Sequence, residues 1–250
     1  MKIIVNNLAV EYRDEGSGPV MLFLHGWQDN LHTFDLLTQA LKNKRRIIRV
    51  DLPGFGASEM PKFAWDLDAY VRFITDFITK LEILPDTLVG HSFGGRIAIK
   101  AIAKKTVHPQ KAILIASAGI AKTYTPRNIF FKICAKAGKI IMIIPPFFLW
   151  RNQIRRKLYA ITGSDYPETG DLTETFLNII KEDLSSVAAA IDIPTLLIWG
   201  GDDTQTPPCD GKKLADIIPG SRLEIISGAG HFVHQQYPEH VSKLIQDFIL

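Results

Sequence analysis

Residues 88–95 of this 250-residue chain, Leu-Val-Gly-His-Ser-Phe-Gly-Gly, decide the fold. They place Ser92 between Gly90 and Gly94 in the pattern Gly-x-Ser-x-Gly. Apolar residues precede the pattern, and residues 96–103, which have helical spacing, follow it. A serine on a tight turn between a strand and a helix projects its hydroxyl outward, and glycines let the backbone turn without a Cβ clash. This context favours a nucleophilic serine over a structural serine in a glycine-rich turn.

The composition indicates one large domain, or one domain that carries an insertion. Apolar residues make up 46% of the chain and charged residues 22%, which is typical of a soluble globular protein, and the net charge of +3 is too small to indicate a nucleic-acid partner. Cys134 and Cys209 are far apart, which favours free thiols. No signal peptide or apolar run long enough to span a membrane is evident. We therefore expect a cytoplasmic protein.

Short apolar segments alternate with segments of helical spacing along most of the chain. Strands are expected at residues 3–5, 8–12, 20–24, 47–50, 87–89, 112–116, 194–199 and 222–226, and helices at 34–41, 67–81, 96–103, 211–218 and 239–250. This alternation predicts an α/β fold with a mostly parallel central sheet and helices on both faces. Residues 119–185 lack strand patterns, so they are expected to form a helical cap over the carboxyl edge of the sheet. The core is then formed by residues 1–118 and 186–250.

A serine hydroxyl needs a base to act as a nucleophile near neutral pH. His231 follows the last expected strand on a glycine-bearing loop, which places it at the same sheet edge as Ser92. His234 is the nearest rival, three residues further on. His91 adjoins the serine, but its side chain should point away from that of Ser92. The remaining histidines are His25, which opens another loop, and His32, His108 and His240, which we expect to be bystanders.

The base in turn needs a carboxylate that orients it. Asp202 and Asp203 both follow the strand that ends at Trp199, and the strand position alone leaves both possible. An ester-cleaving site also needs two N–H donors for the oxyanion. We expect the backbone N–H of Phe93, directly after the serine, and that of Trp27, in the loop after residues 20–24.

Together these residues resemble the α/β-hydrolase superfamily. The motifs that carry the resemblance are residues 25–27, 51–58, 90–95, 199–203 with Pro207, and 228–231. In the family's acid motif the aspartate stands three residues after a glycine and four before a proline, and this register selects Asp203. The resemblance implies a catalytic triad of Ser92, Asp203 and His231. A serine at position 92 argues against the family's dehalogenases and epoxide hydrolases, which use an aspartate.

The segment from Lys122 to Lys157 contains nine basic residues and no acidic residue, so the rest of the chain has a net charge of −6 (+3 minus +9). It also contains the apolar run at residues 140–150. We expect a cap whose apolar face covers the acyl pocket and whose lysines face water. A sharper alternative is weak contact with an anionic membrane, or the attraction of acidic substrates.

These observations favour a serine hydrolase that cleaves small carboxylic esters through an acyl-enzyme intermediate, without a metal or an organic cofactor. One alternative is hydrolysis of a carbon–carbon bond, as in meta-cleavage product hydrolases, which use the same triad. The other is a non-catalytic ligand-binding protein on the same fold. The sequence leaves the natural substrate and the oligomeric state open.

Overall fold

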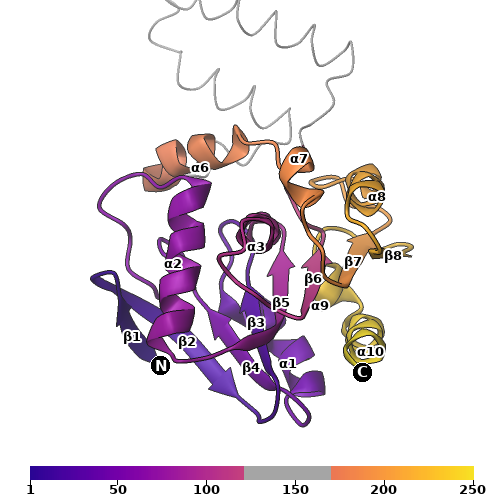
Figure 1. Ribbon diagram of the computed structural model, residues 1–250, viewed down its shortest axis with the longest axis horizontal. Helices are drawn as coiled ribbons and strands as arrows, with labels where there is room; N and C mark the ends of the chain where they lie inside the picture. The colour runs from indigo at the N-terminus through magenta and orange to yellow at the C-terminus, as the bar shows by residue number, and fades with distance from the viewer. Residues whose placement is uncertain (121–169) are drawn as a thin grey trace, which may run out of the picture.

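The computed structural model describes residues 1–120 and 170–250 (Figure 1). In this part of the chain, eight strands form one sheet in the order β1-β2-β4-β3-β5-β6-β7-β8. The strands are β1 (Lys2–Val5), β2 (Leu8–Glu15), β3 (Val20–Leu24), β4 (Arg46–Val50), β5 (Pro85–His91), β6 (Lys111–Ile115), β7 (Thr195–Gly200) and β8 (Arg222–Ile226). β1 and β2 form an antiparallel hairpin, β2 is antiparallel to β4, and all other neighbours are parallel. The predicted α/β class with a mostly parallel sheet is confirmed.

Helices cover both faces of the sheet, which explains why the central strands are continuously apolar. The strand β3 is buried along its whole length, and its residues alternate between two hydrophobic clusters: Leu22 and Leu24 belong to one, Met21 and Phe23 to the other. The first cluster includes residues of α2, α3 and α8, and the second includes residues of α1 and α10. These helices are α1 (Asp35–Leu41), α2 (Leu67–Lys80), α3 (Phe93–Ala103), α8 (Pro208–Ile217) and α10 (Pro238–Ile249).

Several boundaries differ from those expected, among them the end of β2 and the starts of α3 and α8. The strand β2 continues to Glu15 rather than ending at residue 12, because residues 12–15 pair with β4. The helix α3 begins at Phe93, three residues earlier than expected, so that Gly94 and Gly95 lie in its first turn. Close packing requires glycine there, since a Cβ on Gly94 would lie 2.0 Å from the carbonyl oxygen of Leu24. The early helix start matters because it brings the helix N-terminus directly against Ser92.

Figure 1 shows β5 and β6 pointing toward the side of the molecule on which α6 and α7 lie. A short 3-10 helix, η4 (Gly170–Leu172), leads into α6 (Thr173–Ile180), which α7 (Ser185–Ala188) follows. The N–H of Trp65 donates to Oγ1 of Thr175 at 3.0 Å, and the N–H of Leu184 donates to the carbonyl oxygen of Gly119 at 2.9 Å. The first contact holds the end of the expected cap against the core, and the second joins the two ends of that cap. The rest of that cap, with the basic segment, lies outside the described residues, and the division into core and cap stays a prediction.

Two basic side chains of α3 also anchor α6. The guanidinium of Arg96 donates to the carbonyl oxygens of Ile179, at 2.7 Å, and of Glu182. Lys100 lies 2.8 Å from the Glu182 carboxylate and 2.9 Å from that of Asp68. Burial lowers the pKa of Arg96 to about 10. The helix that follows Ser92 therefore also fixes the segment that leads out of the expected cap. No helix among the described residues is both long and apolar enough to cross a membrane.

Candidate active site

The backbone at Ser92 is strained. It has φ 48° and ψ −108° between the end of β5 and the start of α3, in a region that non-glycine residues rarely adopt. Such a conformation costs about 1–3 kcal/mol and persists only where the surroundings hold it. The strand β6 and the segment after it do so: the N–H of Ser92 donates to the carbonyl oxygen of Ile115 at 3.0 Å, and the carbonyl oxygen of Ser92 accepts from the N–H of Ala118 at 3.1 Å. Ser92 thus sits on a tight, supported turn.

Asp203 and His231 form a buried pair on the loops after β7 and β8. Nδ1 of His231 lies 2.8 Å from Oδ2 of Asp203, and the two side chains are 7% and 0% exposed. Asp203 Oδ1 accepts the N–H groups of Gln205, at 2.8 Å, and Thr206, at 3.0 Å. Burial raises the pKa of the Asp203 carboxyl, but its hydrogen bonds with His231 and Thr206 outweigh burial and hold the pKa below its usual value. The carboxylate is therefore kept ionised, in contact with one imidazole nitrogen.

The structure separates the two adjacent aspartates that the sequence left open. Asp202 is exposed, and its N–H donates to the carbonyl oxygen of Ala229 at 2.8 Å. Asp203 is buried against His231. Of the two, Asp203 is the one whose carboxylate contacts this imidazole, and its catalytic role stays a prediction.

One small cavity brings together four segments that are distant in the sequence. The described residues that line it are Gly26, Trp27, Asp29, His91, Ser92, Gln205, His231 and Phe232. Ser92 and His231 thus face a common space at the carboxyl edge of the parallel strands. Three of the five expected site residues line this cavity, while Asp203 lies behind His231 and Phe93 lies beside Ser92.

The two expected oxyanion donors lie on residues whose rings pack together. The indole of Trp27 and the ring of Phe93 meet edge to face with centroids 5.4 Å apart, and both contact Phe55. Within residues 1–120 and 170–250, neither the N–H of Trp27 nor that of Phe93 donates to a backbone carbonyl. Phe93 is the first residue of α3, where N–H groups lack partners within the helix and favour negative charge.

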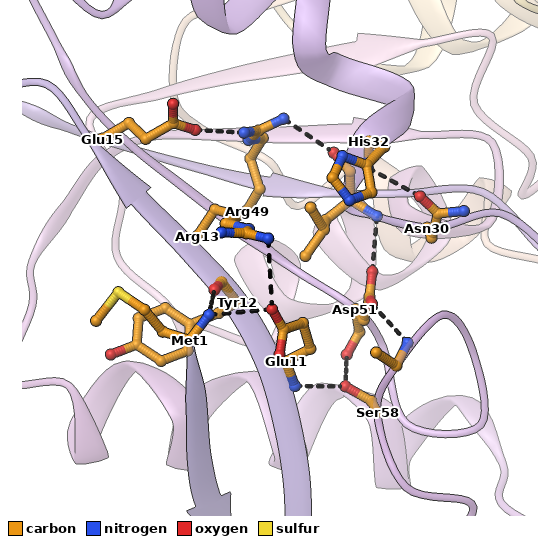
Figure 2. Close-up of polar contacts among 12 residues, drawn as sticks. Met1, Glu11, Tyr12, Arg13, Glu15, Asn30, His32, Arg49, Asp51 and Ser58 are labelled. Atoms are coloured by element: carbon orange, nitrogen blue, oxygen red, sulfur yellow. Dashed lines mark hydrogen bonds and ion pairs between the residues drawn. The ribbon is translucent and has the colours of Figure 1, made fainter.

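The loop that contains Trp27 is fixed by buried polar groups on both sides. His25 accepts the N–H of Leu52 at Nε2, 2.9 Å away, and donates from Nδ1 to the carbonyl oxygen of Gly26 at 2.7 Å. The carboxylate of Asp51 accepts the N–H groups of Leu31, at 2.7 Å, and of Ala57, at 2.8 Å. Figure 2 shows Asp51 in this network beside Ser58. His25 therefore has a structural role in this loop.

The other histidines are placed away from the Asp203 carboxylate. Nε2 of His234, the sequence rival, lies 3.0 Å from Oγ1 of Thr33, and burial lowers the pKa of His234 to about 3. His91 is also buried, which holds its pKa well below the usual value, and its Nε2 lies 3.1 Å from the carbonyl oxygen of His231. His32, His108 and His240 are exposed.

Two polar residues of the site, Thr206 and Asp29, were not predicted from the sequence. Thr206 contributes a hydroxyl 2.9 Å from Asp203 Oδ2 and 3.0 Å from the carbonyl oxygen of Ala116. The signal was available, because an aspartate followed closely by threonine in a loop is typical of local side-chain turns. Asp29 lines the cavity, and no sequence pattern pointed to it. Among the described residues, no group of three or more His, Cys, Asp or Glu side chains is arranged to hold a metal ion.

Comparison with known proteins identifies the family of the chain. A family model described as "Alpha/beta hydrolase family" matches residues 21–242. The chain belongs to the alpha/beta hydrolase family. This alpha/beta hydrolase is 30% identical over 256 residues to the AB hydrolase superfamily protein YisY of Bacillus subtilis, covering 94% of this chain and 93% of the relative. It is 26% identical to the 2-hydroxymuconate semialdehyde hydrolase of a Pseudomonas species, covering 99% of this chain and 93% of the relative.

Solved structures share the fold of this alpha/beta hydrolase. A meta-cleavage product hydrolase from Pseudomonas fluorescens superposes with a TM-score of 0.75 at 20% identity, covering 99% of this chain and 96% of the other. An esterase from Exiguobacterium antarcticum superposes with a TM-score of 0.76 at 23% identity, covering 99% and 98%. These solved structures show the fold alone, and it is the family match that makes the chain a hydrolase-type protein. The choice between ester and carbon–carbon bonds depends on the site itself.

Proposed function

We propose that this alpha/beta hydrolase cleaves carboxylic esters through an acyl-enzyme on Ser92. One observation carries the proposal: the strained turn at Ser92 and the imidazole of His231 face one cavity, and His231 is bonded at 2.8 Å to the buried Asp203. Nucleophile, base and orienting carboxylate are the three groups that this chemistry requires.

In the proposed mechanism, Ser92 Oγ attacks the ester carbonyl carbon while Nε2 of His231 takes the hydroxyl proton. The backbone N–H groups of Phe93 and Trp27 stabilise the negative charge on the carbonyl oxygen. Each such donor lowers the activation free energy by about 3–4 kcal/mol. His231 then gives its proton to the departing alcohol oxygen. A water molecule, deprotonated by His231, then attacks the acyl carbon. As the bond from that carbon to Ser92 Oγ breaks, His231 returns the proton to Oγ, and the acid leaves.

Asp203 acts through His231 rather than on the substrate. Its Oδ2 holds the proton-bearing Nδ1, so that Nε2 is free to accept a proton from Ser92. The carboxylate charge also stabilises the imidazolium that forms during attack. Because its own pKa is held low, Asp203 keeps this charge throughout the cycle.

Carbon–carbon bond hydrolysis is the second candidate, and the 26% identical 2-hydroxymuconate semialdehyde hydrolase is the finding that favours it. Ring-cleavage dienoates are anionic and need a cationic or strongly donating wall. Among the described residues, the cavity lining contains the carboxylate of Asp29 and no lysine or arginine. This charge pattern favours neutral esters.

A direct comparison of substrates separates the candidates. The purified chain is assayed against p-nitrophenyl esters of increasing acyl length and, in parallel, against a ring-cleavage dienoate, with absorbance as the readout. We expect turnover of the esters, and kcat/KM for the best ester above that for the dienoate. A higher kcat/KM for the dienoate would assign carbon–carbon hydrolysis. No turnover of either, together with no labelling by a fluorophosphonate, would favour a ligand-binding protein.

A further inference from the structure

Asp29 places a carboxyl group in the wall of the cavity that holds Ser92 and His231. It lies two residues after Trp27, on the loop between β3 and the 3-10 helix η1 (Leu31–Phe34). The mechanism proposed above gives Asp29 no role. An acidic residue in the lining of the cavity that also contains Ser92 therefore calls for a separate explanation.

The two oxygens of this carboxyl group differ. Oδ1 accepts the N–H of Asn30 at 2.8 Å, which fixes the orientation of the side chain. Oδ2 is buried and has no hydrogen-bond partner within the described part of the chain. Buried acceptors are rarely left unpaired, because losing water without gaining a donor is unfavourable. The missing donor is therefore expected from a molecule that enters the cavity.

The position of Asp29 indicates which part of a substrate it meets. Trp27, on the same loop, supplies an expected N–H for the carbonyl oxygen of the acyl group. Gln205 and Phe232 line the cavity beside His231, which protonates the leaving alcohol in the proposed mechanism. The acyl chain is therefore the part that extends toward Asp29.

The charge around the cavity sets what the acyl chain can carry. Asp29 is the acid among the described lining residues, and none of those residues is a lysine or an arginine. A second carboxylate close to Asp29 would be repelled, whereas a hydroxyl could donate to Oδ2.

We propose that Asp29 is a specificity-determining residue that selects acyl groups bearing a hydroxyl and rejects acyl groups bearing a carboxylate. This inference rests on the proposed ester hydrolysis. The carboxylate oxygen of Asp29 accepts the substrate hydroxyl, and its charge excludes half-esters of dicarboxylic acids.

Three p-nitrophenyl esters of similar length test the inference: the butyrate, the 3-hydroxybutyrate and the hemisuccinate. In wild type we expect kcat/KM to be highest for the hydroxylated ester and lowest for the carboxylate-bearing ester. Asp29→Asn keeps an oxygen for the N–H of Asn30 and removes the charge. In this variant kcat/KM for the hemisuccinate should therefore rise about tenfold relative to that for the butyrate. Asp29→Ala should lower kcat/KM for the hydroxylated ester about tenfold relative to the butyrate, mainly through KM.

Asp202→Asn is the matched control, because it removes the same charge from an exposed side chain outside the cavity lining. It should leave kcat/KM of the 3-hydroxybutyrate and of the hemisuccinate, each relative to that of the butyrate, unchanged. Ratios in Asp29→Asn and Asp29→Ala that equal those of wild type would overturn the inference while leaving ester hydrolysis intact. Failure of wild type to hydrolyse any of the three esters would instead overturn the proposed function, and the inference with it. Thermal melting of each variant confirms that it is folded.

Discussion

His91 donates its Nε2–H to the backbone carbonyl oxygen of His231 across a distance of 3.1 Å. The donor residue directly precedes Ser92 at the end of β5, and the acceptor residue carries the proposed base. A single hydrogen bond thus connects the strand that presents the nucleophile to the loop that presents the base. The rings of His91 and His231 also lie close, with centroids 4.9 Å apart.

His91→Leu tests this connection. Leucine fills a similar volume but donates no hydrogen bond, so the carbonyl oxygen of His231 loses its partner and the base loop loses a restraint. We expect kcat to fall about ten- to a hundredfold, because small displacements of reacting groups are costly, while KM changes little. Steady-state kinetics with a neutral p-nitrophenyl ester measure kcat and KM separately. An unchanged kcat would show that the base loop is positioned without His91.

The pair of aspartates offers a second comparison. Asp203→Asn keeps the shape of the side chain but removes the charge and disturbs the tautomer of His231, so kcat should fall about 10⁴-fold. Asp202→Asn, at the exposed neighbouring position, should leave kcat within about twofold of wild type. The assay is the same ester hydrolysis. Similar losses in the two variants would contradict the assignment of Asp203 as the orienting carboxylate.

Burial of a neutral histidine makes stability depend on pH. Burial lowers the pKa of His234 from 6.5 to about 3, so below pH 6.5 the unfolded chain binds a proton that the folded chain does not. The stabilisation is complete above pH 6.5 and is lost as the pH falls toward 3. By about pH 5 the free energy of unfolding has fallen by roughly 2 kcal/mol through His234.

His234→Gln should flatten this dependence, because glutamine does not titrate and can still bond the hydroxyl of Thr33. Urea unfolding of both proteins at about pH 7.5, 6 and 5 measures it. Burial also lowers the pKa of His25, which is present in both proteins and cancels in the comparison. His91 packs against His234 with ring centroids 4.5 Å apart, and burial followed by the charge of His234 lowers its pKa, so the measured difference includes the response of His91. Stability curves that run parallel in the two proteins would contradict a buried neutral His234.

The tight packing of the turn after Ser92 predicts intolerance to any side chain at Gly94. A Cβ there would lie 2.0 Å from the carbonyl oxygen of Leu24, so strand and helix must separate. Gly94→Ala should therefore lower the free energy of unfolding by more than about 3 kcal/mol, despite the better helix propensity of alanine. Gly220→Ala, at a positive φ of 68° with nothing within 4 Å, should cost about 1–2 kcal/mol. Equal melting temperatures for the two variants would contradict the close approach.

The sheet was predictable because its strands are short apolar runs separated by turn residues. The unbroken run at residues 20–24 indicated a strand covered on both faces, and the structure confirms this. The start of α3 was misplaced because Gly94 and Gly95 are poor helix formers in isolation, whereas here close packing against Leu24 and Ser117 requires them. Local propensity and tertiary packing conflict at this turn, as expected where a chain holds strain at a site.

The candidate site was less predictable in its polar surroundings. Asp203 could be chosen over Asp202 by the family register, but spacing alone left both open, because the direction of each carboxylate depends on the N–H groups of Gln205 and Thr206. Asp29 carries no sequence signal, since its place in the cavity wall depends on how the loop after β3 folds against Ser92. The position of a residue after a strand predicts the sheet edge at which it lies. It does not predict which polar side chains of the loop point into the cavity.

Covalent labelling tests the central claim most directly. The chain is incubated with a fluorophosphonate, digested, and the modified peptide is identified by mass spectrometry, with Ser92→Ala and His231→Gln treated in parallel. We expect one adduct, on Ser92, which is absent in Ser92→Ala and forms at least about a hundredfold more slowly in His231→Gln. An adduct on another residue, or labelling of Ser92 at an unchanged rate without the imidazole of residue 231, would contradict that claim.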